Sequence, residues 1–214
     1  MLGEVPIVSV NSGVVALLGE RENRHGEMCD VYSGIRKSPV LGRTDLYLGP
    51  EGLEDLDGHR IDEQADKRLS KGHRIHGGPL KAVYAYPRVH YENWVAELGT
   101  VLVPGDFGEN LTVDDVTESV VKIGELWRWG QAILRVTGPR RPCYKLNMLR
   151  GQGTSEAMMQ NGRCGWYFSV VQTGQVPTTG TIHILHRPTK GVTITEAFQR
   201  KTSADPTIPG MPED

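Results

Sequence analysis

The chain has 214 residues, with 24 Lys and Arg against 26 Asp and Glu, so its formal charge is −2. This length suits one domain with an ordinary core, and the near-neutral charge excludes a broad basic face for a nucleic-acid polymer. Glycine (26 residues) and proline (13 residues) are abundant. They predict many turns between short elements and hence a mainly β fold.

Cysteine usage and the N-terminal segment bear on the compartment. Cys29, Cys143 and Cys164 are widely spaced, and no pair has C-x-x-C spacing, which predicts three reduced thiols. The opening MLGEVPIVSV lacks the basic and apolar regions of a signal peptide. No stretch approaches the roughly 18 apolar residues of a membrane span. We therefore expect a cytoplasmic protein with no membrane partner.

Strand and turn patterns fill the first third of the chain. Residues 5–10, VPIVSV, predict an opening strand. Residues 30–60 interrupt brief apolar stretches with Gly, Asp and Pro, which predicts further strands and turns. Residues 62–78 are polar and rich in His and Gly, and they predict a surface loop with a functional role.

The middle of the chain predicts a strand, a helix and a hairpin. Residues 80–86 predict a strand, and the apolar spacing after Pro87 predicts a helix that Gly99 ends. Residues 118–136 predict two or three short strands, and RWGQAILRV has the pattern of a hairpin. The two tryptophans of this segment alternate along a strand, which predicts core or interface positions.

The last third predicts a helix, two strands and a terminal helix. Residues 155–160 predict a short helix, and residues 166–171 and 181–186 predict a hairpin-like pair of strands. Thr193-x-x-Glu196 is the pattern of a capping box that opens a final helix. Together the elements predict a mostly antiparallel β domain, closed or partly closed as a barrel, with two or three helices attached.

The segment 138–147, GPRRPCYKLN, places a thiol among cations. If it is extended, Arg141, Cys143 and Lys145 share one face; if it is a helical turn, Arg140 and Cys143 are neighbours. Either geometry sets a fixed cation beside the thiol, which favours the thiolate, the form that attacks electrophiles and binds metals. The alternative is an inert structural cysteine.

A second segment, His76-Gly77-Gly78 followed by Lys81, suits an anion. Paired glycines let backbone N–H groups approach a ligand, and the lysine adds positive charge. The spacing of a Walker loop is absent. The alternative is an ordinary loop that leads into the next strand.

A third segment is the polar turn DFGEN, which ends in Glu109 and Asn110. Its Asp-Phe-Gly does not indicate a protein kinase, because the Gly-rich and His-Arg-Asp motifs are absent. The carboxylate and the amide either orient a polar ligand or cap the turn.

Four blocks in this order, HGGPLKAVYAYPRVHYENW, FGENLTV, RRPCYKLN and GRCGWYFSVV, together resemble the MOSC domain, the β-barrel module named for the C-terminal part of molybdenum-cofactor sulfurases. The match is to the stand-alone bacterial branch and extends from residue 34 to residue 200. It implies a MOSC-type barrel with a few peripheral helices over residues 1–200, followed by a Pro-rich polar tail, 201–214. It also implies the molybdenum cofactor (Mo-molybdopterin); pyridoxal phosphate is not expected.

The resemblance also implies roles for single residues. Cys143 matches the thiol that binds molybdenum or carries sulfur for it, and Arg141 would face the phosphate or pterin of the cofactor. The other residues implied to line or serve this pocket are His76, Gly77, Gly78, Lys81, Glu109, Asn110 and Lys145. For proton delivery, His76 or Glu109 is the candidate acid.

The resulting prediction is a molybdenum-dependent reductase of N-hydroxylated compounds such as hydroxylaminopurines or amidoximes. The chain has neither ferredoxin-like cysteines nor a flavin motif, so electrons are expected from a separate reductase. The first alternative is a carrier of sulfur or of the molybdenum cofactor without turnover of its own. A thiol hydrolase or a plain binding barrel is the second, which the sequence favours less because it offers no Cys–His–Asn set.

Overall fold

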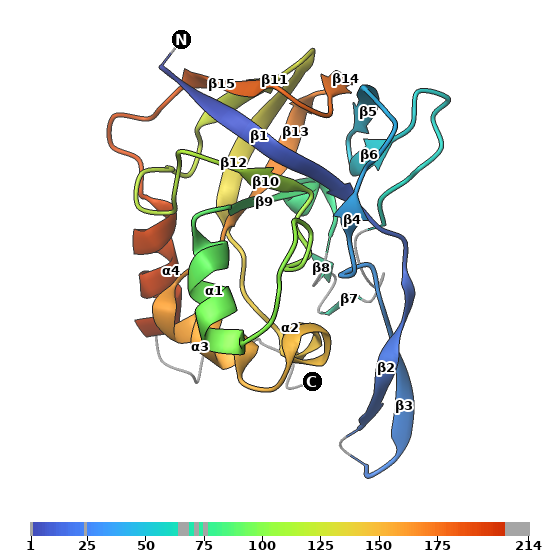
Figure 1. Ribbon diagram of the computed structural model, residues 1–214. Helices are drawn as coiled ribbons and strands as arrows, with labels where there is room; N and C mark the ends of the chain where they lie inside the picture. Colours follow the sequence, from blue (N-terminus) through green and yellow to red (C-terminus); the bar gives the residue numbers. More distant parts are fainter. Residues whose placement is uncertain (1, 24, 64–68, 71–72, 75–76, 204–214) are drawn as a thin grey trace.

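A closed sheet organises the fold. The computed structural model describes residues 2–23, 25–63, 69–70, 73–74 and 77–203. Within these ranges seven strands form a barrel: β1 (Gly3–Ser12), β9 (Val83–Pro87), β10 (Leu111–Val113), β11 (Leu126–Trp129), β12 (Ala132–Pro139), β13 (Trp166–Gln172) and β15 (Thr181–His186). Their order is β10-β9-β13-β12-β11-β15-β1, and the pairing of β10 with β1 closes the ring (Figure 1). The predicted mainly β barrel is confirmed.

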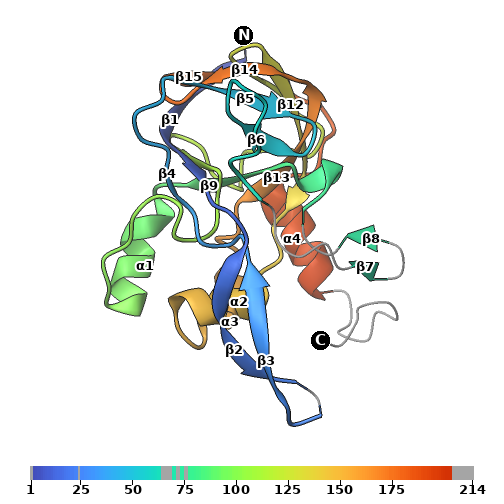
Figure 2. The ribbon, with the colours of Figure 1, turned by 90° about the vertical axis from the view of Figure 1, so that its right-hand side faces the viewer.

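Smaller sheets surround the barrel. They contain β5 (Asp45–Gly49), β6 (Gly52–Glu54) and β14 (Gly174–Pro177) in one sheet, the pair β2 (Ala16–Glu22) and β3 (Met28–Ser33), and the pair β7 (Leu69–Ser70) and β8 (His73–Arg74). Strand β4 (Ser38–Pro39) extends the barrel sheet beside β1. The β2–β3 hairpin projects well beyond the barrel (Figure 2). The segment at the end of β3, residues 33–37, contributes lining residues to the cleft described below.

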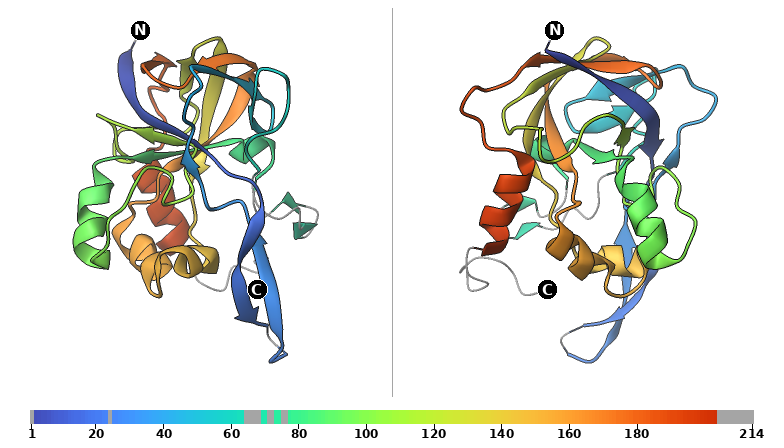
Figure 3. Two further views of the ribbon diagram at one scale, coloured as in Figure 1. Left: turned by 45° about the vertical axis from the view of Figure 1, so that its right-hand side comes forward. Right: turned by 60° about the vertical axis from the view of Figure 1, so that its left-hand side comes forward.

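The helices gather at one end of the barrel, the end from which the hairpin projects (Figure 3). They are α1 (His90–Leu98), α2 (Tyr144–Arg150), α3 (Thr154–Asn161) and α4 (Ile194–Ser203), with the short 3-10 helix η1 (Pro79–Lys81). The boundary predicted at residue 200 falls inside α4, and residues 204–214 lie outside the described ranges. None of the helices in these ranges is both long enough and apolar enough to span a bilayer.

Glycines and a capping box mark three helix ends, and the predicted stop at Gly99 is confirmed. Gly99 and Gly162 follow α1 and α3 with φ of 63° and 72°, the left-handed conformation that favours glycine. At the start of α4, the Glu196 N–H donates to Thr193 Oγ1 (3.1 Å) and the Thr193 N–H donates to Glu196 Oε2 (2.8 Å). This is the predicted capping box.

One predicted pairing is wrong. Residues 166–171 and 181–186 do not pair with each other: β13 pairs with β12 and β9, and β15 pairs with β1 and β11. The intervening β14 pairs with β5. Every strand of a closed barrel is hydrogen-bonded along both edges. Both edges of β13 and of β15 are occupied by other barrel strands, so these two strands have no free edge on which to pair with each other.

Aromatic side chains fill the barrel. The ring centroid of Trp127 lies 5.9 Å from that of Trp166 and 5.2 Å from that of Phe168, both edge-to-face. Trp127 and Trp129 are fully buried, which confirms their predicted place in the core.

A second aromatic cluster packs α1 against the barrel. Tyr86 stacks on Phe107 with ring centroids 4.9 Å apart, and the Trp94 Nε1–H donates to the Tyr86 hydroxyl (2.6 Å). Phe107 belongs to the DFGEN turn. The cluster therefore fixes the turn whose residues Phe107 and Gly108 form one wall of the cleft.

Candidate functional site

The thiol of the RRPCYKLN segment lies at a junction between strand and helix. Strand β12 ends at Pro139, and Cys143 is the last extended residue before α2, with φ −138° and ψ 170°. Its carbonyl accepts the first helical bond from the Leu146 N–H (2.9 Å). Pro142 directly precedes it and cannot donate a backbone hydrogen bond. Cys143 is thus the half-buried N-cap residue of α2. Its position corresponds neither to the extended strand nor to the helical turn that the sequence offered as alternatives.

A partly open cleft, of about 540 Å³ when the space open to solvent is included, lies beside this thiol. Elements far apart in sequence meet there: the segment after β3, the segment before η1, β9, the DFGEN turn, the β12–α2 junction and β13. The lining residues are Ser33, Gly34, Ile35, Lys37, Gly77, Tyr84, Phe107, Gly108, Arg140, Arg141, Cys143, Lys145 and Tyr167.

Positive charge dominates this lining. Arg140, Arg141, Lys145 and Lys37 line the cleft, and no carboxylate does so among the residues that the structure describes. Lys37 is neutralised by a buried ion pair with Asp62, which lies behind the wall. The two arginines, Arg140 and Arg141, add positive charge to the lining, which favours an anionic ligand.

Arg140 is one of two buried cations in the lining, with Lys145. Its residue is only 5% exposed, its guanidinium lies 5.2 Å from the ring centroid of Tyr84, and its Nη1–H group contacts Met158 Sδ at 3.4 Å. A guanidinium stays charged even when it is buried and holds anions bidentately. Lys145 is also buried, and its Nζ donates to the Tyr32 carbonyl (3.2 Å) at the base of the hairpin.

Two tyrosines form the aromatic wall of the cleft. The rings of Tyr84 and Tyr167 lie with centroids 5.3 Å apart. Burial raises the pKa of both phenols, and the nearby Arg140 cation opposes that rise. Both side chains therefore remain protonated at neutral pH.

Four of the residues predicted from the sequence come together at the cleft. Cys143, Arg141 and Lys145 line it, as does Gly77, whose φ of 65° requires glycine. Arg141 is exposed at the rim, in contrast to the buried Arg140. The segment thus contributes two arginines to the cleft, although the sequence singled out only the second as a cofactor contact.

Three predicted cofactor residues are not among the lining groups. Gly78 accepts a hydrogen bond from the Lys81 N–H (2.8 Å) and begins η1. The Nζ of Lys81 lies 5.7 Å from the ring centroid of Tyr167, which is a lining residue. Asn110 is fully buried in the barrel seam, where its Oδ1 accepts from the Tyr84 N–H (3.1 Å). Its Nδ2 donates to the Asn11 carbonyl of β1 (3.4 Å), so Asn110 links two barrel strands and is not a lining residue of the cleft.

Glu109, a predicted proton donor, is a structural group. Its carboxylate is fully buried and accepts from the Gly105 N–H (2.8 Å) and the Phe107 N–H (3.1 Å). It also accepts from the hydroxyls of Thr112 (2.8 Å) and Tyr91. Burial raises its pKa, and these hydrogen bonds oppose the rise. Because the carboxylate holds the DFGEN turn closed and does not line the cleft, it is not placed to deliver a proton there.

The other candidate acid, His76, lies outside the described residues. The lining residues that the sequence did not single out are Ser33, Gly34, Ile35, Lys37, Tyr84, Phe107, Gly108, Arg140 and Tyr167. Tyr84 lies in the first of the four blocks that resemble the family and Tyr167 in the fourth. Their place in these blocks is the one sequence feature that could have drawn attention to them. Lys37 belongs to GIRKSPV, where the resemblance begins.

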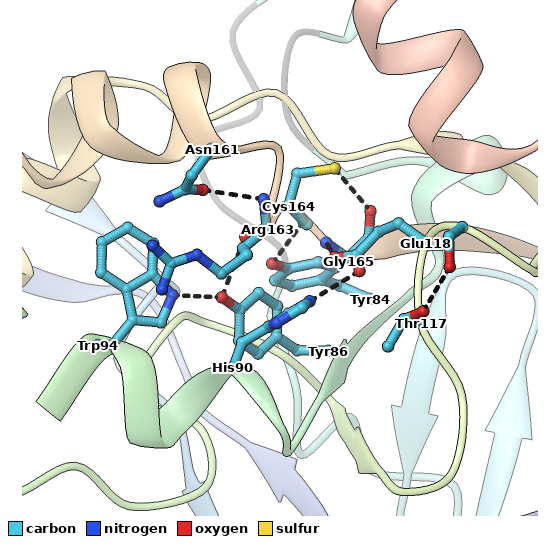
Figure 4. Close-up of polar contacts among 11 residues, drawn as sticks. Tyr84, Tyr86, His90, Trp94, Thr117, Glu118, Asn161, Arg163, Cys164 and Gly165 are labelled. Atoms are coloured by element: carbon cyan, nitrogen blue, oxygen red, sulfur yellow. Dashed lines mark hydrogen bonds and ion pairs between the residues drawn. The ribbon is translucent and has the colours of Figure 1, made fainter. Parts of the chain in front are cut away.

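The other two cysteines are poor candidates for the site. Cys29 is exposed on β3, and Cys164 is buried, where burial raises the pKa of its thiol. Figure 4 shows that Cys164 belongs to a hydrogen-bonded network with Tyr84 and Gly165, and Cys164 is not a lining residue of the cleft. There its carbonyl accepts from the Tyr84 hydroxyl (2.9 Å), and the next N–H, that of Gly165, donates to Glu118 (2.7 Å).

Comparisons with known proteins identify the family. The family model described as the MOSC domain matches residues 72–182. Protein YiiM of Escherichia coli (strain K12) is 40% identical over 169 residues, which are 77% of this chain and 69% of that protein. The crystal structure of YiiM from Geobacillus stearothermophilus has a TM-score of 0.68 at 25% identity, covering 92% of this chain and 84% of that one.

A more distant relative is named for an activity. A protein named "Reductase" from Gibberella moniliformis (strain M3125 / FGSC 7600) is 34% identical over 128 residues, 58% of this chain but 22% of that protein. The barrel, the matched family model and the YiiM relatives agree. This chain belongs to the MOSC domain family.

Proposed function

We propose that this chain binds the molybdenum cofactor in the cleft and reduces N-hydroxylated compounds with electrons from a separate reductase. The observation that carries the proposal is the cleft itself. An accessible thiol stands beside two arginines, Arg140 and Arg141, with no carboxylate among the described lining residues. The membership of the MOSC family and the reductase-named relative support it further.

The chemistry of the lining fits this cofactor. A thiolate is a soft ligand suited to a thiophilic metal, and the pterin dithiolene and its phosphate are anionic. Cys143 would ligate molybdenum, and Arg140 with Arg141 would hold the phosphate by charge-assisted hydrogen bonds. Gly77, which has no side chain, leaves room for a ligand to approach its backbone. When bound, the cofactor would supply the two-electron chemistry that breaks an N–O bond.

The residues around the thiol would act by binding and orientation. Tyr84 and Tyr167 present ring faces and edges on which a planar pterin or purine could pack. Arg140 is fixed between the Tyr84 ring and Met158, so little side-chain entropy remains to be lost when an anion binds. The Lys37 ammonium is paired with the Asp62 carboxylate, so it adds little to the positive charge that an anion in the cleft would meet.

Turnover by the loaded protein tests the proposal. The full chain is produced in a host that makes the cofactor, and it is supplied with a hydroxylaminopurine and chemically reduced methyl viologen. We expect one aminopurine for every two electrons consumed, measured by chromatography and viologen absorbance. Protein without cofactor is the control. Protein that holds molybdenum but forms no aminopurine contradicts the reductase and supports the carrier of sulfur or cofactor.

A further inference from the structure

The β2–β3 hairpin lies outside the barrel sheet and projects from the end where the helices gather (Figure 2). Its two strands form a sheet of their own. A two-stranded hairpin is marginally stable by itself in water, so this one depends on contacts at its base and on one of its faces.

The carboxylate of Asp62 holds the base of the hairpin. It accepts from the Gly13 N–H (3.1 Å) on the chain that enters the hairpin, and it pairs with the Lys37 ammonium on the chain that leaves it. The Glu63 N–H donates to the Gly13 carbonyl (2.9 Å). The two chains cross so closely that a Cβ on Gly13 would lie 2.0 Å from the Arg36 carbonyl oxygen. The base of the hairpin is therefore fixed to the wall of the cleft, which includes Lys37.

The inner face of the hairpin, the one that carries Arg21, packs against α2. The Arg21 guanidinium lies 4.1 Å from the ring centroid of Tyr144, the first residue of α2. The Nζ of Lys145 donates to the Tyr32 carbonyl (3.2 Å). Because α2 begins directly after Cys143, the hairpin is attached to the helix that follows the candidate metal ligand.

The outer face of the hairpin is exposed. The cross-strand pairs Leu17 with Tyr32, Glu20 with Asp30 and Glu22 with Met28 form this face, and the pairs between them belong to the inner face. Its apolar members are open to solvent: Met28 is 62% exposed, Leu17 51% and Tyr32 50%. Large apolar side chains that gather on an exposed surface indicate a site of protein interaction.

The polar members of the outer face are all acidic. Glu20, Glu22 and Asp30 are exposed, and within the described residues none of them has an ion-pair partner. Arg21 lies on the inner face, and Arg24 lies outside the described residues. This face is therefore complementary to a protein surface that presents Lys and Arg around an apolar patch. A second copy of this chain would instead place like charges opposite each other.

The size and place of the outer face suit a protein that donates electrons. One face of a hairpin is small, and transient redox encounters bury less area than stable complexes do. Ser33 and Gly34 line the cleft and directly follow Tyr32 of the outer face, so a protein docked there lies beside the cleft. Complementary charge accelerates such weak and repeated association.

We infer that the outer face of the β2–β3 hairpin is the docking surface for the electron donor, a flavin or iron–sulfur protein with a basic face. For each R–NH–OH reduced, the donor's flavin or cluster is oxidised by two electrons and solvent supplies two protons. The N–O bond breaks, and R–NH₂ and water form. The inference rests on the proposed function for the identity of the partner as a donor, whereas the place and charge of the surface can be tested on cofactor-free protein.

Binding of cytochrome c, a redox protein with lysines around its haem edge, tests the surface. Titration calorimetry at low ionic strength compares the wild-type full chain with two triple variants that lose the same charge. The hairpin variant carries Glu20→Gln, Glu22→Gln and Asp30→Asn, and the control variant carries Glu4→Gln, Glu92→Gln and Asp115→Asn, all at exposed carboxylates outside the hairpin. We expect the hairpin variant to bind at least about 10-fold more weakly than the other two proteins, and the difference to vanish at high salt, because salt screens exposed charges. Thermal unfolding at the wild-type temperature verifies that both variants are folded.

Electron transfer tests whether the docked complex is productive. Loaded protein is chemically reduced and mixed with oxidised cytochrome c below saturation, and the haem absorbance is followed by stopped flow. We expect a slower transfer from the hairpin variant than from the control variant.

Three results would overturn the inference. They are equal affinities or equal transfer rates for the two variants, tighter binding of wild type to the acidic protein flavodoxin than to cytochrome c, and a wild-type dimer in light scattering that the hairpin variant loses. The last result would make this face an interface between two copies of the chain. Loaded protein that forms no aminopurine with reduced viologen refutes the proposed function instead, and the binding comparison on cofactor-free protein does not depend on that outcome.

Discussion

Cys143→Ser is expected to abolish molybdenum retention while the barrel stays folded. Serine is nearly isosteric with cysteine, but its hydroxyl does not ionise near neutral pH and is a hard ligand for a thiophilic metal. Cys143 occupies the N-cap of α2, and serine is among the preferred N-cap residues. The variant should therefore unfold at the wild-type temperature or slightly above it. Elemental and pterin analysis beside thermal unfolding measures both effects.

The surface thiol offers a matched control for this substitution. Cys29→Ser changes the same atom on the exposed hairpin and should leave the molybdenum content at the wild-type level. Loss of metal from the Cys29 variant, or retention by the Cys143 variant, would show that the wrong thiol was chosen. Unfolding of Cys143→Ser would support the alternative that this cysteine is a structural core residue.

Arg140→Gln is expected to weaken cofactor binding by about 10- to 150-fold. A hydrogen bond to a charged group contributes about 1.5–3 kcal/mol, which converts to that range of affinity. The residue is buried and is held against the Tyr84 ring, so water screens its charge little. The measurement is the amount of pterin retained after dialysis against increasing volumes of buffer. Glutamine is chosen because it keeps a long polar side chain without the positive charge.

Arg141→Gln provides the comparison within the same segment. Arg141 also lines the cleft but is exposed, so solvent screens its interaction with a phosphate. We expect a smaller loss of pterin than for Arg140→Gln. A larger loss for Arg141→Gln would show that Arg141, the residue implied by the family resemblance, makes the main contact with the anion.

Local sequence patterns predicted most of the strands and helix ends, because these features depend on neighbouring residues. The hairpin of β11 and β12, the left-handed Gly99 and the capping box of Thr193 are examples. Closure of the barrel through β10 and β1 joins segments about a hundred residues apart. No local pattern records such a pairing, and for this reason β13 and β15 were paired incorrectly.

The site was predictable where one segment supplies several groups. GPRRPCYKLN contributes Cys143, Arg141 and Lys145, which the sequence singled out, and all three line the cleft. Lys37 and Tyr167 come from other elements and reach the cleft only through the barrel topology. Their roles could not follow from spacing along the chain.

Glu109 illustrates a different limit. A polar residue that organises a turn and one that contacts a ligand have the same appearance in a sequence. The distinction lies in its hydrogen-bond partners, and here the partners are backbone N–H groups of its own turn and two buried hydroxyls. A carboxylate with these partners organises its own turn and does not line the cleft.

Alkylation of the three thiols in loaded and cofactor-free protein tests the link between Cys143 and the metal most directly. Iodoacetamide should label the exposed Cys29 in both forms and the buried Cys164 in neither, so both serve as internal standards. We predict that Cys143 is labelled in cofactor-free protein and protected in loaded protein, in proportion to the molybdenum content. Equal labelling of Cys143 in a form that holds a full complement of molybdenum would contradict the account.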